Sequence, residues 1–398
     1  MNKDSGIAIL YVHANNTDIG GADYCLFKLV SSLNREIFTP IVCLTKKTRI
    51  VELYEKESID VNIVNMVRLQ KRSDFRYWLS FIHSFFPTII CLWRIIKSKK
   101  ILLVHANDSL DIYGPVAGWL ARIETIQHMR LSAIEPYGLK LLIGWFAFFL
   151  NEKILSVSDA VASEFFSYRK QKLPKIETCY DWVDMEKVGH GSRKSQDVRK
   201  ELSIPPSALV IGNVGRLEYL KGQHLFIEAA NIVTRTFPNA HFIIVGGTVN
   251  GRRRENYLQS LRNRVKELGL QEKVIFIGER SDILDIMNCF DVFVLSTVSI
   301  DSFPGVVLEA MACGKPVVGP NAGGVPEQVE NGKSGILYTP NNFKTMAEAI
   351  AYLLSLSKEK RNQMGQEGKS RVRNLFTREK IYPKIERIYK EVLNLYFK

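Results

Sequence analysis

Residues 296–316 read S-T-V-S-I-D-S-F-P-G-V-V-L-E-A-M-A-C-G-K-P and constrain the fold more than any other part of the chain. Short apolar runs at 291–295 and 316–318 flank the segment, as expected of two buried parallel strands. Pro304 and Gly305 are typical of a loop that enters the first turn of a helix. A strand, an acidic loop, a helix and another strand in this order place a ligand at the carboxyl edge of a parallel sheet.

Two carboxylates, Asp301 and Glu309, lie eight residues apart around the start of this expected helix. A helix start offers unpaired N–H groups and a partial positive charge, which suit a phosphate bound by the amides of residues 305–307. Taken alone the two acids are weak evidence, because the chain has 41 Asp and Glu and most such pairs are solvated surface. The whole segment is the more specific signal.

Strand-like and helix-like segments alternate along both halves of the chain. In the first half we expect strands at 7–12, 39–44, 59–64, 101–105, 124–128 and 153–157, and helices such as 22–33, 111–121 and 158–168. In the second half we expect strands at 209–214, 241–246, 273–277, 291–295, 316–318 and 335–338, and helices such as 222–235, 255–268, 305–313 and 343–357. Alternation at this spacing predicts an α/β protein with two Rossmann-like doubly wound domains that face each other across a cleft.

Two cations follow the strand at 209–214. Arg216 can bind two oxygens at once, and Lys221, five residues later, acts as a point charge. A diphosphate leaving group needs such cations to stabilise the charge that develops as its bond breaks. An isolated R-x4-K-G is more often a pair of surface cations, so this motif gains weight only beside the acidic segment.

Together these motifs resemble those of the family-4 retaining glycosyltransferases of GT-B fold, the glycosyl transferases group 1, which carry a Glu-x7-Glu signature. The resemblance implies that Arg216 and Lys221 bind the donor diphosphate and that Glu309 binds the ribose hydroxyls. Asp301 would meet the donor hexose, although it is one methylene shorter than the Glu usual there. The resemblance covers nearly the full length, most specifically residues 207–340.

The N-terminal half supplies the other expected site residues. Gly20 and Gly21 precede a helix and occupy the place where the family closes a Gly-Gly-Ala loop over the donor diphosphate, although Gly-Gly before a helix is also common as a plain turn. His128 matches the family's histidine near the reacting carbon, with His105 as a second candidate; a histidine at a strand end is as often structural. Arg130 could steer an anionic acceptor or the donor phosphate. The implied donor-binding set is Gly20, Gly21, Arg216, Lys221, Asp301, Phe303, Gly305, Val306, Val307 and Glu309.

Competing cofactor and metal motifs are missing from the sequence. There is no G-x-G-x-x-G after a strand and no Asp-x-Asp, so neither a dinucleotide nor the metal clamp of most GT-A transferases is predicted. Six scattered cysteines indicate reduced thiols, with neither a disulfide framework nor a zinc site. We expect a metal-independent enzyme without a cofactor, in which cations and helix termini do the work of Mg²⁺.

The domain boundaries follow from composition. We expect an N-terminal acceptor-binding domain at 1–180, a polar linker at 181–206 and a nucleotide-sugar-binding domain at 207–373. Residues 374–398 are expected to form an amphipathic helix, which the resemblance implies crosses back to the N-terminal domain. Its apolar stripe is Ile381, Ile385, Ile388, Tyr389, Val392 and Leu395.

The net charge of +13 suggests a further partner. Cations cluster in the N-terminal half beside the apolar stretches 75–96 and 139–150, which suits either an anionic membrane surface or ordinary solvated faces. Nucleic acid is not expected, because no reader motif accompanies the charge. Neither a signal peptide nor a transmembrane segment is predicted, so the expected location is cytoplasmic or peripheral on the inner membrane face. The cations are Arg68, Lys71, Arg72, Arg76, Arg94, Lys97, Lys99, Lys100, Arg169, Lys170, Lys172 and Lys175.

The predicted function is therefore transfer of a hexose from a nucleotide-diphosphate sugar to a glycan or lipid-linked glycan, with retention at the anomeric carbon, in surface polysaccharide or glycolipid synthesis. Two alternatives stay open. One is a catalytically silent nucleotide-sugar-binding subunit, and the other is a GT-B-shaped epimerase that uses the same donor without an acceptor.

Overall fold

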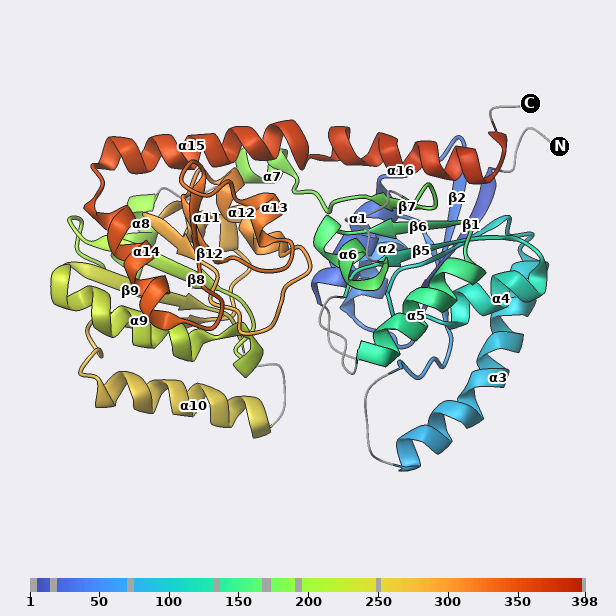
Figure 1. Cartoon of the computed structure of the whole chain (residues 1–398), viewed down its shortest axis with the longest axis horizontal. Coiled ribbons are helices and arrows are strands. Elements are labelled where there is room, and N and C mark those ends of the chain that lie inside the picture. Colours follow the sequence, from blue (N-terminus) through green and yellow to red (C-terminus); the bar gives the residue numbers. More distant parts are fainter. Residues whose placement is uncertain are drawn as a thin grey trace. The chain divides into compact units, whose positions relative to one another are not determined.

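The computed structural model describes residues 6–14, 20–69, 75–131, 137–166, 173–189, 195–247 and 252–395. The chain divides into two compact units (Figure 1). The first contains Met1–Asp181 together with Ile381–Lys398, and the second contains Trp182–Lys380. Each unit is an α/β structure built on one parallel sheet, which confirms the predicted fold class.

The sheet of the first unit has seven parallel strands in the order β3-β2-β1-β4-β5-β6-β7. The strand order reverses between β1 and β4, which pair directly with Leu10 opposite Val104. The strands are β1 (Ile7–His13), β2 (Phe38–Leu44), β3 (Asp60–Ile63), β4 (Leu103–Ala106), β5 (Glu124–Met129), β6 (Lys153–Ser156) and β7 (Ile176–Thr178).

Helices cover both faces of this sheet, because right-handed crossovers on either side of a reversal lie on opposite faces. The helices that connect its strands are α1 (Gly21–Ser31), α2 (Arg49–Lys56), α3 (Phe75–Ser98), α4 (Tyr113–Ala121), α5 (Tyr137–Leu150) and α6 (Asp159–Phe166). Leu10 and Val12 of β1 share a core with Leu92 and Ile96 of α3 and with Tyr113 of α4. Neighbouring strand residues point the other way, as a pleated strand requires.

The C-terminal helix α16 (Arg378–Val392) packs on the first unit. Of its predicted apolar stripe, Ile381, Ile385, Ile388, Tyr389 and Val392 are buried. The hydroxyl of Tyr389 lies 2.7 Å from Nδ1 of His105 in β4 and accepts a hydrogen bond from Tyr11 in β1 at 3.3 Å. Burial lowers the pKa of His105 to about 3, so its ring is neutral and its Nδ1 can accept a hydrogen bond from the Tyr389 hydroxyl.

The sheet of the second unit has six parallel strands in the order β10-β9-β8-β11-β12-β13, with the reversal between β8 and β11. The strands are β8 (Leu209–Val214), β9 (Ala240–Val245), β10 (Val274–Gly278), β11 (Val292–Val294), β12 (Val317–Pro320) and β13 (Gly335–Tyr338). Its helices are α7 (Met185–Gly189), α8 (Ser195–Glu201), the 3-10 turn η1 (Tyr219–Lys221), α9 (Gln223–Thr236), α10 (Arg252–Glu267), α11 (Ile283–Asn288), α12 (Gly305–Ala312), α13 (Val325–Gln328), α14 (Phe343–Ser355) and α15 (Lys358–Leu375).

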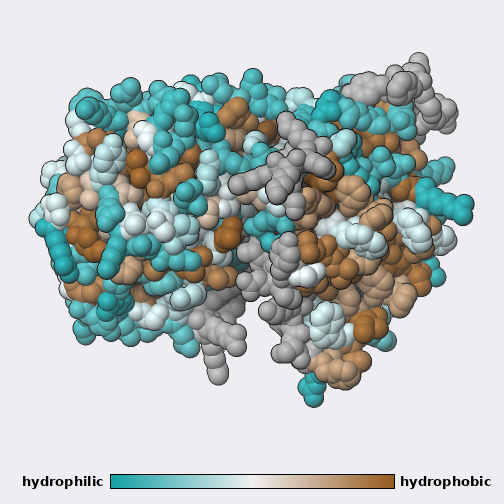
Figure 2. Space-filling view, viewed as in Figure 1, coloured by the Kyte–Doolittle hydropathy of each residue, from teal (hydrophilic) through white to brown (hydrophobic). Residues whose placement is uncertain are grey.

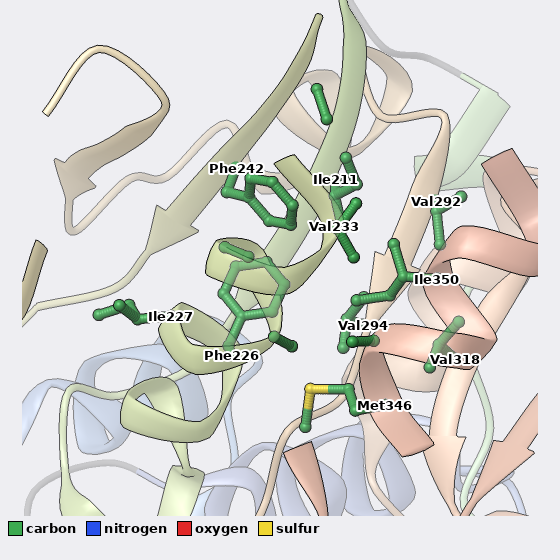
Figure 3. Packing of buried hydrophobic residues seen from close by; sticks show 14 of the residues in the cluster. Ile211, Phe226, Ile227, Val233, Phe242, Val292, Val294, Val318, Met346 and Ile350 are labelled. Atoms are coloured by element: carbon green, nitrogen blue, oxygen red, sulfur yellow. The ribbon is translucent and has the colours of Figure 1, made fainter. Parts of the chain in front are cut away.

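A dense apolar core holds α9 and α14 against this sheet (Figure 3). Phe226 of α9 meets Phe242 of β9 edge to face, with 5.4 Å between the ring centroids, and Met346 and Ile350 of α14 belong to the same cluster. Strands buried on both faces read as continuous apolar runs, and for that reason these strands could be located from the sequence.

Of the segment 181–206, expected to be a linker, Asp181 is grouped with the first unit and the residues from Trp182 onward with the second. Val198 of α8 and Ile204 are buried, and Arg199 donates to the carboxylate of Asp291 at 2.9 Å. Helix α8 is amphipathic, with Val198 as its buried residue. The short strand β7 was also not expected from the sequence.

Helix α3 is longer than the apolar stretch that marks it in the sequence. The expectation of no transmembrane segment considered residues 81–93, whereas the helix runs from Phe75 to Ser98. It is long and apolar enough to cross a membrane by length and composition, a test that core helices of soluble proteins also pass. Pro87 lies inside the helix.

We predict that Tyr389→Phe destabilises the first unit by about 1–3 kcal/mol, because it leaves buried His105 without its hydrogen-bond partner. Urea unfolding followed by circular dichroism measures the change. Tyr352→Phe is the matched control, since Tyr352 on α14 is exposed and should give no measurable change. Equal stability of the two variants would show that this hydrogen bond does not hold α16 in place.

Candidate functional site

The candidate site lies where the strand order of the second sheet reverses. Loops that leave the carboxyl ends of β8 and β11 diverge there, which makes this edge the usual ligand position in doubly wound sheets. The loop after β8 carries Arg216 and Lys221, and the loop after β11 carries Asp301 and leads into α12. The structure thus brings together the two motifs that the sequence identified separately.

Gly222 allows the cationic loop to approach the acidic loop. Its φ of +69° is in the left-handed region, and a Cβ atom there would lie 1.9 Å from the carbonyl oxygen of Ser296. Hydrogen bonds then join the two loops: Ser296 Oγ donates to the carbonyl of Lys221 at 2.8 Å, and Thr297 Oγ1 donates to that of Leu220 at 2.9 Å. The position of Lys221 is therefore fixed by backbone contacts as well as by its own side chain.

Each of the two cations has an acidic neighbour. Lys221 Nζ lies 3.1 Å from Oδ2 of Asp301, and Arg216 lies 3.1 Å from Oε1 of Glu218. All four side chains are partly exposed, so solvent screens both pairs and a ligand can reach them. A diphosphate could share these cations with the two carboxylates at little desolvation cost.

The start of α12 is open to solvent at Gly305. A Cβ atom there would have nothing within 4 Å, and Pro304 at the N-cap makes no side-chain cap. The amide of Val307, expected to bind phosphate, instead donates to the carbonyl of Pro304 at 3.1 Å, and the Val307 side chain is buried. This part of the prediction is corrected, because the first turn closes on itself; the amides of Gly305 and Val306 remain the candidates.

Phe303 is also placed differently from the expectation. Its side chain is buried, and its ring packs edge to face on Phe376 with 5.5 Å between the centroids. Phe303 therefore anchors the acidic loop to the end of α15 and can reach a ligand only through its main chain. Glu309, one turn further along α12, is partly exposed.

Two adjacent glycines, which the sequence analysis did not identify, pack closely against the main chain of the acidic loop. A Cβ atom on Gly323, whose φ is +58°, would lie 2.1 Å from the carbonyl oxygen of Asp301, and one on Gly324 would lie 2.0 Å from that of Ser302. The Gly324 amide donates to the Asp301 carbonyl at 3.1 Å. Adjacent glycines directly after a buried strand were the available sequence signal.

A cavity of about 380 Å³ lies at the opposite, amino-terminal edge of the same sheet, and Arg199, Asp291, Lys315 and Arg361 are among its lining residues. Its cations already have protein partners: Arg199 contacts Asp291, and Lys315 Nζ donates to the carbonyl of Asn288 at 2.8 Å. Ligands of doubly wound sheets bind outside the carboxyl ends of the strands, so we place the candidate site at the Arg216–Asp301 edge.

In the first unit, Gly20 and Gly21 begin α1 as expected, but the Gly20 amide is occupied. It donates to the carboxylate of Asp23 at 2.7 Å, and the other oxygen of Asp23 lies 3.3 Å from Nε2 of His13 at the end of β1. A phosphate could bind the Gly20 amide only by displacing Asp23. His13 was not identified from the sequence, although its place at the carboxyl end of a central strand was a usable signal.

His128 near the end of β5 is enclosed, with 1% of its surface exposed. Its ring centroid lies 5.6 Å from that of His105, and Nδ1 lies 3.3 Å from the Arg130 guanidinium. Burial, followed by the charge of Arg130 and by His105, holds the pKa of His128 well below its usual range. The ring is therefore neutral, and this geometry favours the structural alternative over direct contact with a substrate.

Arg130 is likewise engaged within the protein. Its NH1 group donates to both oxygens of Asp181 at 2.6 and 2.9 Å, and Nε donates to Oδ1 of Asn107 at 2.9 Å. Burial alone would lower the pKa of Arg130, but the Asp181 carboxylate outweighs it and the net shift is upward. An anionic acceptor would have to compete with a buried bidentate ion pair, so the expected steering role of Arg130 is not supported by this arrangement.

Among the described residues, no group of three or more His, Cys, Asp or Glu side chains is arranged to hold a metal ion. All six cysteines are free thiols. The groups of the second unit's site that could bind an anion are Arg216, Lys221 and main-chain amides. These groups can bind a diphosphate and stabilise negative charge as it forms.

Comparisons with known proteins agree with this chemistry. Residues 194–371 match the profile of the family described as glycosyl transferases group 1. The D-inositol 3-phosphate glycosyltransferase of Corynebacterium urealyticum is 36% identical over 187 residues, which is 46% of this chain and 43% of that protein. The chain thus spans less than half the length of this relative. The capsular polysaccharide biosynthesis glycosyltransferase CapM of Staphylococcus aureus is 26% identical over 86% of this chain and 93% of CapM.

Solved structures show the same fold over almost the whole chain. HepE from Anabaena, determined in complex with UDP, superposes with a TM-score of 0.81 at 23% identity, covering 97% of this chain and 100% of HepE. The same protein has been determined with UDP-glucose. At this level of identity the likeness establishes the fold.

Asp111, which follows β4, gives the first unit a pH-dependent stability. Its Oδ1 accepts hydrogen bonds from the amides of Tyr113 and Gly114, while burial raises the pKa of its carboxyl group to about 7. The stability that the Asp111 carboxyl group contributes is fully present below its pKa in the unfolded chain, near 4. It is lost as pH rises through its pKa in the folded protein, about 7. His105 contributes the opposite slope, since its folded pKa lies below its unfolded value.

We therefore predict that Asp111→Asn becomes progressively more stable than the wild type as pH rises from about 4 to 8, by roughly 1.4 kcal/mol for each unit of the pKa shift. Urea unfolding at several pH values measures the difference, in which the histidine contributions cancel. Asp197→Asn, at an exposed position on α8, is the control and should follow the wild type. A constant difference between Asp111→Asn and wild type across this range would refute the assignment.

Proposed function

We propose that the chain, whose residues 194–371 match the glycosyl transferases group 1 and which has the GT-B fold, moves a hexose from a nucleotide-diphosphate sugar to a hydroxyl of a glycan or lipid-linked glycan. The observation that carries the proposal is the ion pair between Lys221 and Asp301 at the reversal point of the second sheet, on a loop that also carries Arg216. Capsule or other surface glycan synthesis is the proposed setting, supported by the likeness to CapM.

In the proposed site, Lys221 and Arg216 bind the diphosphate, and Glu309 binds the ribose of the nucleotide. Asp301 lies beside Lys221, so it can accept hydrogen bonds from the hexose while its charge partner holds the phosphate. The amides of Gly305 and Val306 belong to the first turn of α12, directly after the loop that carries Asp301, and are proposed to bind phosphate or sugar oxygens. These groups are preorganised by the backbone contacts around Gly222 and Gly324, and preorganised charge is what stabilises a leaving anion.

We further propose that the transfer retains the anomeric configuration and needs no metal. The bond from the anomeric carbon to the diphosphate oxygen breaks, and its electron pair leaves with the diphosphate. The acceptor oxygen then bonds to the anomeric carbon from the same face, and its proton passes to the departing phosphate oxygen. The cations neutralise the charge on the leaving group, which is the task that Mg²⁺ performs in metal-dependent transferases.

The structure offers no observation that favours the two alternatives, a silent binding subunit or an epimerase, over transfer. The alternative of a silent binding subunit rests on Asp301, which stands where the family usually has Glu. Asp301 makes an ion pair with Lys221, so the shorter side chain still contacts the cation. Incubation of the protein with UDP-glucose separates the three cases: transfer needs an added acceptor, an epimerase gives a new nucleotide sugar without one, and a silent subunit gives no product.

We predict that Arg216→Ala or Lys221→Ala lowers turnover by on the order of 10² or more, because each removes a positive charge at the developing anion. Initial rates with saturating donor measure the effect. Lys273→Ala is the control, since Lys273 donates to the carbonyl of Pro238 near the amino end of β10 and should leave the rate unchanged. Near wild-type rates for both site variants would exclude the diphosphate assignment.

We also predict that an α-linked donor gives an α-linked product and that activity survives EDTA. The contacts assigned here lie on the leaving-group side of the sugar, which favours attack from that same face. The coupling constant of the anomeric proton in the NMR spectrum of the product reports the outcome. A β-linked product would contradict retention, and loss of activity that Mg²⁺ restores would contradict metal independence.

A further inference from the structure

Helix α5 presents its most apolar stripe to solvent rather than to the core. Ile143 and Ala147 face inward, while the outward positions at intervals of three and four residues are all large and apolar. Trp145 is 57% exposed and Phe149 is 62% exposed. A helix on the surface of a globular domain normally has polar residues on that face. The exposed set on α5 is Leu141, Leu142, Trp145, Phe146 and Phe149.

Helix α3 has the same organisation. One face of α3, with Ile89, Leu92 and Ile96, belongs to the core of the first unit. Only 28% of the most apolar 18-residue stretch of the helix is buried, however. Phe86 is 67% exposed. The exposed apolar set on α3 is Phe75, Trp78, Leu79, Ile82, Phe86, Ile90 and Trp93, at intervals that again follow the helical repeat.

These two stripes lie on the same side of the first unit. Helix α4 packs against both α3 and α5 and adds exposed Trp119 and Leu120. Figure 2 shows apolar residues gathered over this side of the unit, where Figure 1 places α3, α4 and α5. We call the exposed apolar residues of these three helices the apolar face. Soluble monomers rarely expose so extended an apolar surface.

Tryptophan and charge indicate what covers the apolar face. Four of the five tryptophans of the chain, Trp78, Trp93, Trp119 and Trp145, are exposed on it, and tryptophan is enriched where a protein meets the headgroup level of a bilayer. Helices α3 and α5 carry cations, and none of the three helices carries Asp or Glu. Their cations are Arg76, Arg94, Lys97 and Lys140, and Lys140 pairs with Glu164 of α6 at 3.4 Å.

We propose that the apolar face docks onto an anionic lipid leaflet, with α3 and α5 lying in the interface. An apolar stripe rich in aromatic residues and flanked by cations is the pattern that binds such a surface. One side of α3 belongs to the protein core, so lipid cannot surround the helix as it would a membrane-spanning one. The proposal goes beyond the transfer reaction, and its test does not depend on catalysis.

A second copy of the chain is the competing occupant of the apolar face. Two copies related by a twofold axis would place identical cationic borders against each other with no carboxylate on the three helices to neutralise them. An anionic leaflet supplies the opposite charge instead. The charge pattern therefore favours lipid.

The cations that the sequence analysis grouped beside the apolar stretches differ in whether they already have partners within the protein. Lys97 Nζ donates to the carbonyl of Ala121 at 2.9 Å, and Lys99 pairs with Asp60, so both are engaged. Arg94, beside Trp93, and Arg122, at the end of α4, are exposed. The predicted cations Lys71, Arg72, Arg169, Lys170 and Lys172 lie outside the described residues.

Flotation of the full chain with vesicles tests the proposal. We expect binding to phosphatidylcholine vesicles that contain phosphatidylglycerol, and quenching of tryptophan fluorescence when the acyl chains carry bromine. Phe86→Glu combined with Phe149→Glu should weaken vesicle binding at least about tenfold, because it places a charge within each stripe, at its most exposed residue on α5 and at one of the most exposed on α3. Tyr352→Glu on α14 replaces a similarly exposed aromatic residue of the second unit and should bind like the wild type.

The charge contribution is tested separately. Arg94→Gln combined with Arg122→Gln should weaken binding to the anionic vesicles, and so should a rise in salt from about 0.1 M to 1 M, which shortens the Debye length from about 10 Å to 3 Å. Three results would overturn the proposal: no flotation at low salt, equal flotation of the Phe86/Phe149 variant and wild type, or a lipid-free dimer in sedimentation that this variant dissociates. The last result would assign the apolar face to a second copy.

Discussion

The contact between the η1 turn and the loop after β11 organises the candidate site. Gly222 is the residue on which it depends, because a side chain at that position would overlap the Ser296 carbonyl. The hydroxyls of Ser296 and Thr297 then bind the carbonyls of the turn, and the cation of Lys221 meets the carboxylate of Asp301. The ion pair alone is worth little at a partly exposed position, so its geometry is a consequence of the backbone contacts rather than their cause.

The charged groups beside the carboxyl ends of the strands are partly exposed in the second unit and largely buried in the first. In the second unit the charged groups stay partly exposed and can exchange partners with a ligand. In the first unit Arg130, Asp181 and His128 form a buried network in which the guanidinium is already bound on several sides. Removing one partner from such a network leaves a buried charge uncompensated, which is costly. The first network therefore fixes the loops around it, whereas the second is suited to binding an anion.

The sequence predicted the fold class and indicated that the loop carrying Lys221 lies at the same sheet edge as Asp301, because both depend on local patterns. Buried parallel strands read as continuous apolar runs, and residues after strands gather at one edge of the sheet. The sequence could not show that the Val307 amide closes the first turn of α12, or that Asp23 occupies the Gly20 amide. Those outcomes depend on the geometry of side chains and backbone, which the residue types alone do not determine. The buried contacts of Arg130 and His128 were hidden for the same reason, since burial and partners far along the chain decide whether a charged group is available.

The apolar face shows that hydropathy alone does not reveal whether an apolar helix is buried or exposed. A helix that is apolar all round is usually buried, so the sequence of α5 favours a core position. The sheet of the first unit covers only one side of that helix, and the other side stays exposed with Trp145 and Phe149 on it. The cost of such exposure in water is large for aromatic side chains, which bury more apolar area than any others. An environment other than water on that side removes the cost, and the cationic border of the same helices selects an anionic one.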